Sequence, residues 1–281
     1  MGKKLCIAIP ASVVSDVPHL REKTSRIGLI GRAAAIFRVD EIVVYPDRPH
    51  VGQGNEGDLV CTLLKYLETP QYLRKDLFKL SPDLQYAGIL PPLRTPHHPL
   101  NRLAKKLRVG EFREALTLST KGNQTLVDIG VEEPAVNLVK NLPVGKRVTV
   151  KIVKKGRPVE VELADRNDAP SYWGYLVTRE KSSLVSFLKK RVFDLTIATS
   201  KYGSRFADAA GDIAEKWKWA ENVLVAFGAP TQGLREIVGR EGQSLSDLMD
   251  FVLNMVPMQG TETVRTEEAI IASLAILNAT F

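Results

Sequence analysis

Three loops rich in glycine, threonine and proline occur in the carboxy-terminal third of the chain, and each follows a short apolar run. They cover residues 199–203, 227–233 and 257–263. Parallel strands bring their carboxyl ends to one edge of an open α/β sheet, where ligands bind in the crevice between the following loops. Glycine lets backbone groups approach a ligand closely. The spacing therefore predicts a small-molecule site at that edge, and the alternative is that the loops are only turns.

Two glycine patterns, one of them within the loop of residues 227–233, suit phosphate binding poorly. Residues 52–57 (GQGNEG) match the dinucleotide fingerprint, but the prolines of residues 46–49 separate them from the preceding apolar run. We therefore expect a flexible loop there, which argues against a nicotinamide-dependent oxidoreductase. Residues 228–233 have the spacing of a P-loop, but Leu-Arg at residues 234–235 replaces the required Lys-Ser/Thr. A nucleoside triphosphatase is not expected.

Alternating strand and helix patterns surround the three loops and predict an α/β fold with a mostly parallel sheet. The expected strands cover residues 4–9, 41–45, 194–199, 223–228 and 251–257. The expected helices cover residues 23–37, 58–67, 71–80, 184–190, 206–219 and 264–277. In the first helix, Ile27, Ile30, Ala34 and Phe37 recur at helical spacing.

The middle of the chain differs in composition. Prolines mark a boundary near residue 91, and short strands are expected over residues 112–116, 125–129, 148–153 and 159–163. The last two form a hairpin around Lys155-Gly156-Arg157, and several short strands together indicate a small barrel of the OB type. We expect this module over residues 93–165 and the α/β domain over residues 1–92 and 166–281. Tyr172, Trp173 and Tyr175 follow the module, either to stack on bases or, as we expect, to pack in a core.

The positive charge of the chain is concentrated in this middle segment. The formal net charge is +7, and residues 93–165 hold 14 Lys and Arg against 8 Asp and Glu. A basic β module is typical of proteins that bind nucleic acid, although solubility alone also explains such segments. The candidate RNA-binding residues on the module are Lys151, Lys154, Lys155 and Arg157.

The cysteines, the histidines and the apolar segments argue against a disulfide-stabilised protein, a metal site and a membrane protein. Cys6 and Cys61 fall in or beside apolar runs, so we expect buried reduced thiols and no disulfide, as in the cytoplasm. The adjacent His97 and His98 cannot close a metal site alone, and no metal is expected. Uninterrupted apolar segments are too short for a membrane span, and the amino-terminal run is broken by Pro10, so neither a membrane helix nor a signal peptide is expected.

Four segments resemble the SPOUT class of RNA methyltransferases, and more narrowly its archaeal and eukaryotic branch with an OB-like insert. They are TSRIGLIGRAAAIFRVD (24–40), LTIATSKYG (195–203), VLVAFGAPTQGL (223–234) and NMVPMQGTETVRTEEA (254–269). The resemblance covers most of the chain, and the last segment is its most specific part. It implies a carboxy-terminal trefoil knot in which S-adenosylmethionine lies bent, held largely by backbone atoms.

The resemblance also implies site residues and a partner. The cofactor-binding positions are Thr199, Ser200, Phe227, Gly228, Met255, Pro257, Gly260, Thr263 and Val264. The class commonly uses an arginine from the second subunit of a homodimer, and Arg32 matches that position. Arg26 is a second catalytic candidate, although it stands where many relatives carry asparagine, and a surface ion pair is its alternative role. The asparagine-containing ending of ribose 2′-O methylating relatives is replaced by VRTEE (264–268), which favours methylation of a base, for instance at uridine N3, in rRNA or tRNA.

The arginines fit this chemistry. A cation near the reacting atom would lower its pKa and stabilise the developing anion, which is the role we expect of Arg32; a surface ion pair is the alternative. Arg265 is expected to contact either the cofactor or RNA. Thr266 is expected to cap the last helix, and Glu268 is expected to help cap it rather than act as a base. A competing function is a non-catalytic RNA-binding or ribonucleoprotein assembly factor that retains the fold.

Overall fold

The computed structural model describes residues 3–48, 52–122, 124–137 and 142–281. The chain forms two compact units and passes between them more than once. The first unit comprises Met1–Leu67, Pro82–Pro91 and Tyr175–Phe281, and the second comprises Glu68–Ser81 and Pro92–Gly174.

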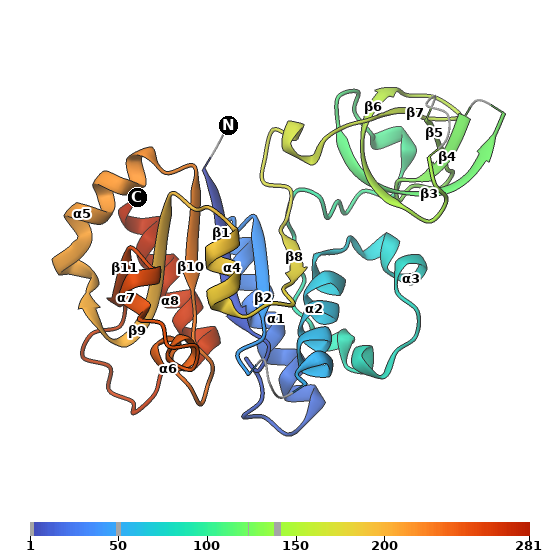
Figure 1. Cartoon of the computed structure of the whole chain (residues 1–281). Helices are drawn as coiled ribbons and strands as arrows, with labels where there is room; N and C mark the ends of the chain where they lie inside the picture. Colours follow the sequence, from blue (N-terminus) through green and yellow to red (C-terminus); the bar gives the residue numbers. More distant parts are fainter. Residues whose placement is uncertain (1–2, 49–51, 123, 138–141) are drawn as a thin grey trace. The chain divides into compact units, whose positions relative to one another are not determined.

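A six-stranded sheet forms the centre of the first unit, with the strand order β11-β9-β10-β1-β2-β8 (Figure 1). All five strand pairings are parallel, which confirms the predicted α/β fold. Helices cover such sheets on both faces, so central strands read as continuous apolar runs. The strands are β1 (Lys4–Pro10), β2 (Glu41–Tyr45), β8 (Leu176–Arg179), β9 (Leu195–Arg205), β10 (Asn222–Ala226) and β11 (Phe251–Asn254).

The helices of the first unit follow the predicted pattern closely. In α1 the side chains of Ile27, Ile30 and Ala34 are buried, as their spacing predicts, and α1 packs against α8. The fourth predicted residue, Phe37, lies just after the helix and is only half-buried. The predicted helices over residues 184–190 and 206–219 are confirmed as α4 and α5. The helices are α1 (Leu20–Ile36), α2 (Gly54–Glu68), α4 (Leu184–Lys190), α5 (Phe206–Trp219), α6 (Leu234–Gly239), α7 (Leu245–Leu248) and α8 (Thr266–Thr280).

The glycine pattern at residues 52–57 is not the flexible loop that we predicted, because α2 begins at Gly54. Within the helix, Gly57 passes beneath the guanidinium group of Arg179, where an added Cβ atom would lie 2.0 Å from Cζ. The Arg179 Nη2 group donates a hydrogen bond to the Gln53 carbonyl at 3.0 Å, just before the helix. The absence of a side chain at Gly57 thus leaves room for the Arg179 guanidinium, which comes from a strand far along the chain.

The second unit is a closed five-stranded barrel with the order β3-β4-β5-β7-β6. All pairings are antiparallel except β5–β7, an arrangement that confirms the predicted OB-like barrel. Its core is aliphatic and includes Val127, Val150 and Ile152. The strands are β3 (Phe112–Lys121), β4 (Gln124–Asp128), β5 (Ala135–Asn137), β6 (Arg147–Lys154) and β7 (Glu160–Leu163).

Short helical turns complete both units. The predicted helix over residues 71–80 is a 3-10 turn followed by the single α-helical turn α3 (Arg74–Leu77), which ends before an extended Phe78. The 3-10 turns are Gln71–Leu73, Pro82–Leu84, Ala87–Ile89, Ala104–Lys106 and Arg166–Asp168.

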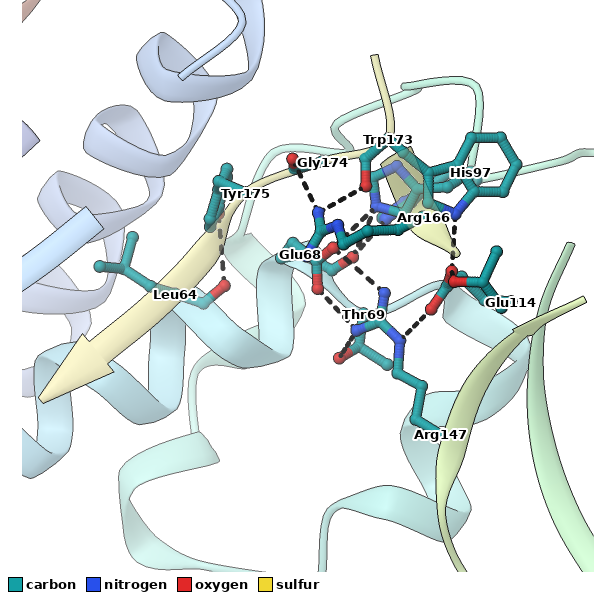
Figure 2. A network of polar contacts seen from close by, with 12 residues as sticks. Leu64, Glu68, Thr69, His97, Glu114, Arg147, Arg166, Trp173, Gly174 and Tyr175 are labelled. Carbon is teal, nitrogen blue, oxygen red and sulfur yellow. Dashed lines mark hydrogen bonds and ion pairs between the residues drawn. The ribbon is translucent and has the colours of Figure 1, made fainter. Parts of the chain in front are cut away.

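A buried network of charged groups ties together separate segments of the second unit (Figure 2). Arg147 on β6 forms ion pairs with Glu68 at 2.6 Å and with Glu114 at 2.5 Å. The Nε1 group of Trp173 donates to Glu114 at 2.6 Å, and the His97 ring lies 3.2 Å from a Glu68 carboxylate oxygen. Trp173 is therefore buried in a core, as expected, and it is not a free platform for bases.

Tyr175 is likewise buried, and its hydroxyl donates to the Leu64 carbonyl at 3.3 Å within the first unit (Figure 2). The two cysteines are buried free thiols. Within the described ranges, no helix has the length and apolar character needed to cross a membrane. The same ranges contain no cluster of three or more His, Cys, Asp or Glu residues suited to a metal ion.

Candidate functional site

A cavity of about 280 Å³ lies in the first unit at the carboxyl ends of β9, β10 and β11. Its walls are residues 199–202, which lie within β9 rather than in the predicted loop, the loops that follow β10 and β11, and α8 between Thr266 and Ser273. Its size is near the lower end of pockets that hold small organic ligands. The predicted cofactor residues in its lining are Thr199, Ser200, Phe227, Gly228, Met255, Thr263 and Val264. Pro257 and Gly260 belong to the same loop as Met255, but they are exposed and outside the lining.

Side-chain hydroxyls from three elements hold the loop that follows β10. They bind the three consecutive backbone carbonyls of residues 226–228: Thr199 on β9 donates to the first at 3.1 Å, Tyr45 on β2 to the second at 2.7 Å, and Thr266 on α8 to the third at 3.1 Å. Burial, and then the nearby Asp47 carboxylate, raise the pKa of Tyr45 well above its ordinary value, so the phenol stays protonated and donates. The loop backbone is therefore fixed before any ligand enters.

Two polar atoms buried in the cavity wall lack a hydrogen-bond partner within the part of the chain that the structure describes. They are Oε1 of Gln232 and Oγ of Ser273. Buried polar atoms in folded proteins are nearly always paired, so these two mark places where a polar ligand atom would bind. A Cβ atom at Gly228 would lie 3.1 Å from the Gln232 carbonyl oxygen and 3.2 Å from the Leu234 nitrogen, so the turn there is tight.

The cavity suits a ligand with both polar and apolar parts. Phe227 and Met255 are buried apolar residues in its wall, and the unpartnered atoms of Gln232 and Ser273 lie in the same wall. An adenosyl group has this mixed character, with an apolar ring face, polar ring nitrogens and ribose hydroxyls, so the residues present fit the adenosyl part of S-adenosylmethionine.

The start of α8 differs from the prediction in one respect. Thr266 does not cap the helix: the cap is Arg265, and the Thr266 hydroxyl instead binds the loop after β10. Glu268 accepts a hydrogen bond from the Arg265 backbone nitrogen at 2.9 Å, which confirms its capping role. The Arg265 side chain is exposed beside the cavity loop and lies outside the cavity lining.

Both candidate catalytic arginines lie on α1. Arg26 forms ion pairs with Asp16 at 2.6 Å and, through Nε, with Glu267 at 3.5 Å. Glu267 is buried in the first turn of α8, so Arg26 connects the segment before α1 to a helix that lines the cavity. Arg32 is half-buried on the same helix. The cavity lining in the described residues includes neither arginine.

The four candidate RNA-binding residues of the barrel divide into two pairs. On β6, Lys151 lies 4.0 Å from Glu162, and Lys154 lies 2.7 Å from Glu160. Lys155 and Arg157 lie instead in the exposed turn between β6 and β7.

The β6–β7 turn joins a second basic segment. The Lys155 Nζ group donates to the Lys105 carbonyl at 3.1 Å. This contact places the turn beside the 3-10 turn Ala104–Lys106, which carries two further lysines. The barrel therefore gathers Lys105, Lys106, Lys155 and Arg157 on neighbouring segments.

Comparison with known proteins identifies the family of this chain. A family model described as "Putative RNA methyltransferase" matches residues 4–277, which is nearly the whole chain. The chain belongs to this family of RNA methyltransferases. Together with the parallel sheet and the five-stranded barrel, this membership confirms the predicted resemblance to the SPOUT class.

Individual relatives of this RNA methyltransferase extend the finding. It is 33% identical to an uncharacterized protein of Haloarcula marismortui over 98% of both chains. It is 35% identical to a Homo sapiens protein named 28S rRNA (uridine-N(3))-methyltransferase, over 97% of this chain and 77% of that one. The protein of the same name in Mus musculus is 36% identical over 97% of this chain and 75% of its own length.

Proposed function

We propose that this RNA methyltransferase uses S-adenosylmethionine to methylate a base in ribosomal RNA, at N3 of uridine. The observation that carries the proposal is the cavity at the carboxyl ends of β9–β11, where the predicted cofactor loops meet around unpartnered polar atoms. The names of the human and mouse relatives support the choice of RNA and of atom. Transfer RNA is the alternative substrate.

The residues that would hold S-adenosylmethionine come from the three loops and from α8. The cofactor supplies a methyl group activated on a sulfonium centre. Backbone groups of the loop after β10 bind and orient its polar parts, because three hydroxyls already fix that loop. Gln232 accepts and Ser273 donates hydrogen bonds to the ligand, and Phe227 and Met255 exclude water. Methyl transfer needs an in-line approach of the nucleophile, so this positioning lowers the barrier.

The arrangement of α1 supports a homodimer in which Arg32 acts at the partner's cavity. Arg32 does not line the cavity of its own chain. Leu29 and Ile36 on α1 are 45% and 56% exposed, and Ile271 on the adjacent α8 is 41% exposed. Exposed apolar side chains of this size on two packed helices favour a surface that a second subunit covers. The same proposal includes a trefoil knot formed by the carboxy-terminal segment.

Within that site, the two arginines have different roles. Arg32 would stabilise the anion that forms when the uracil N3–H gives its proton to solvent, which makes N3 the nucleophile. Arg26 acts through its ion pair with Glu267, which holds the first turn of α8 against α1. Arg26 is therefore a positioning residue in this proposal.

Replacing Ser273 with alanine tests the cofactor site, because protein stability and ligand affinity should respond differently. The Ser273 Oγ atom has no partner among the described residues, so the free energy of unfolding should stay the same or rise. Affinity for S-adenosylhomocysteine should fall by about threefold to tenfold, the worth of one hydrogen bond. Calorimetry and urea unfolding measure the two quantities. Absence of saturable binding to the unaltered protein would favour the non-catalytic assembly factor.

The barrel lysines allow a matched test of RNA binding. Replacing Lys155 and Arg157 together with alanine should weaken RNA binding and reduce the slope of log affinity against log salt by about 0.7 per lost phosphate contact. Replacing Lys151 and Lys154 should change the slope less, because both already lie near glutamates. Filter binding at several salt concentrations measures the slopes. Equal effects of the two double variants would contradict this division.

A further inference from the structure

Strand β9 leaves its pairing with β11 beside the cavity. Ala198 pairs with Val252, but the next residue of β11, Leu253, pairs with Ser204, so residues 199–203 form a large bulge. An added Cβ atom at Gly203 would lie 2.6 Å from the Val252 carbonyl oxygen. Only a glycine lets the two strands come together again this closely. Bulges of this kind often redirect a side chain beside an active site.

Neighbouring elements hold the backbone of the bulge in place. The Asn254 Nδ2 group donates to the Lys201 carbonyl at 2.9 Å, and the Arg235 Nη2 group donates to the Tyr202 carbonyl at 3.2 Å. The Lys201 Nζ group in turn donates to the Glu262 carbonyl at 2.9 Å in the loop after β11. Three contacts, made with strand β11, helix α6 and the loop after β11, therefore fix the bulge.

The bulge presents one large aromatic side chain to solvent. Tyr202 belongs to the cavity lining, yet it is 76% exposed, so it lies at the cavity rim. The bulge also carries Lys201, Arg205 lies two residues after it, and the Arg235 guanidinium binds its backbone. An exposed aromatic ring among cations is the combination that binds single-stranded nucleic acid, because bases stack on the ring and phosphates pair with the cations.

We propose that Tyr202 is a stacking platform for a base of the RNA substrate at the entrance of the cavity. This inference rests on the proposed function and names a substrate contact that the cofactor loops alone do not provide. A base that reacts must leave its helix and be held beside the cofactor, and aromatic stacking supplies part of the free energy for that step. The unpartnered buried atoms that suit the cofactor belong to Gln232 and Ser273, so Tyr202 remains available to RNA.

Binding of a short oligouridylate containing 5-iodouridine, with photo-crosslinking, tests the proposal. Tyr202→Ala should weaken binding by about fivefold to a hundredfold at fixed salt, whereas Tyr202→Phe should stay within about twofold of the unaltered protein. The crosslink should map to the peptide that contains Tyr202 and disappear in the alanine variant. Trp219→Ala is the matched control, since Trp219 on α5 is 78% exposed but lies outside the cavity lining.

Affinity for S-adenosylhomocysteine, measured on the same variants, shows whether the Tyr202 ring contacts RNA or the cofactor. It should be unchanged in Tyr202→Ala. Loss of that affinity with normal RNA binding would mean that Tyr202 covers the cofactor, and equal RNA binding by Tyr202→Ala and Trp219→Ala would also overturn the proposal. The RNA measurement involves no methyl transfer. A protein that binds oligouridylate through Tyr202 but never binds S-adenosylhomocysteine would therefore contradict the proposed function alone.

Discussion

Arg32→Ala is expected to lower kcat for RNA methylation by about a hundredfold to a thousandfold, the usual effect of removing one group that stabilises a developing anion. Affinity for S-adenosylhomocysteine should change by less than about twofold, because Arg32 lies outside the cavity lining of its own chain. Transfer of a labelled methyl group to RNA and calorimetry measure the two quantities. Arg21→Ala, on the exposed first turn of the same helix, is the control and should leave both unchanged.

Mixed dimers show whether Arg32 acts across the interface. Gly228→Val should block the cavity, since even a Cβ atom there is crowded by the loop backbone. Arg32→Ala and Gly228→Val should each be inactive alone, but a mixture should recover activity, because one mixed subunit keeps an open cavity and receives Arg32 from its partner. An active Arg32→Ala protein would remove Arg32 from the mechanism. An inactive mixture would contradict the action of Arg32 across the subunit interface.

Arg147→Ala is expected to lower the free energy of unfolding at neutral pH by about 3–5 kcal/mol, the usual effect of removing one partner of a buried ion pair. Arg147 pairs with the buried carboxylates of Glu68 and Glu114, and both would lose their guanidinium partner (Figure 2). Urea unfolding measures the loss. Lys151→Ala is the control, since its exposed pair with Glu162 should contribute less than about 1 kcal/mol.

The loss of unfolding free energy in Arg147→Ala should depend on pH, and the pKa of Glu68 determines the direction of that dependence. Burial alone would raise the pKa of Glu68, but the Arg147 guanidinium and the His97 ring outweigh it and hold the pKa below its usual value. The ionised Glu68 carboxylate therefore stabilises the wild-type protein above its unfolded-state pKa, and this stabilisation is lost as pH falls through its folded-state pKa. Without Arg147, burial should raise the pKa of Glu68, so acidification should narrow the difference between variant and wild type. A difference that is constant from acidic to neutral pH would contradict this account.

Elements with a strong local signal were predictable from the sequence. The apolar runs at residues 4–9 and 41–45 gave β1 and β2, because a strand buried on both faces needs no polar side. The helical spacing of Ile27, Ile30 and Ala34 gave the buried face of α1. The loops after β10 and β11 were predictable for a similar reason, since each directly follows a short apolar strand, whereas residues 199–203 lie within β9.

Features made by long-range contacts were not predictable. Strand β5 has three residues and exists through its barrel partners, so it carries no periodicity of its own. Strand β8 was missed as well, because it is a short edge strand with mixed side chains. The sequence predicted Tyr45 only as the last residue of a strand, although its hydroxyl donates to the Phe227 carbonyl in a loop 182 residues away.

The bulge at residues 199–203 was predicted only as a loop. Its form depends on where β11 pairs with β9 again, which no local pattern shows. The adjacent histidines of residues 97–98 gave no hint of a charged network, because their partner Glu68 is distant in sequence. The residues that position the site are therefore mostly those whose partners lie far along the chain.

Mass spectrometry of nucleosides tests the central claim most directly. Ribosomal RNA lacking the modification would be incubated with S-adenosylmethionine and either the unaltered protein or Gly228→Val, and then digested to nucleosides. If the cavity at β9–β11 is the methyl-transfer site, the unaltered protein should form 3-methyluridine and Gly228→Val should form none. Formation of a ribose-methylated nucleoside, or equal 3-methyluridine from both proteins, would contradict the account.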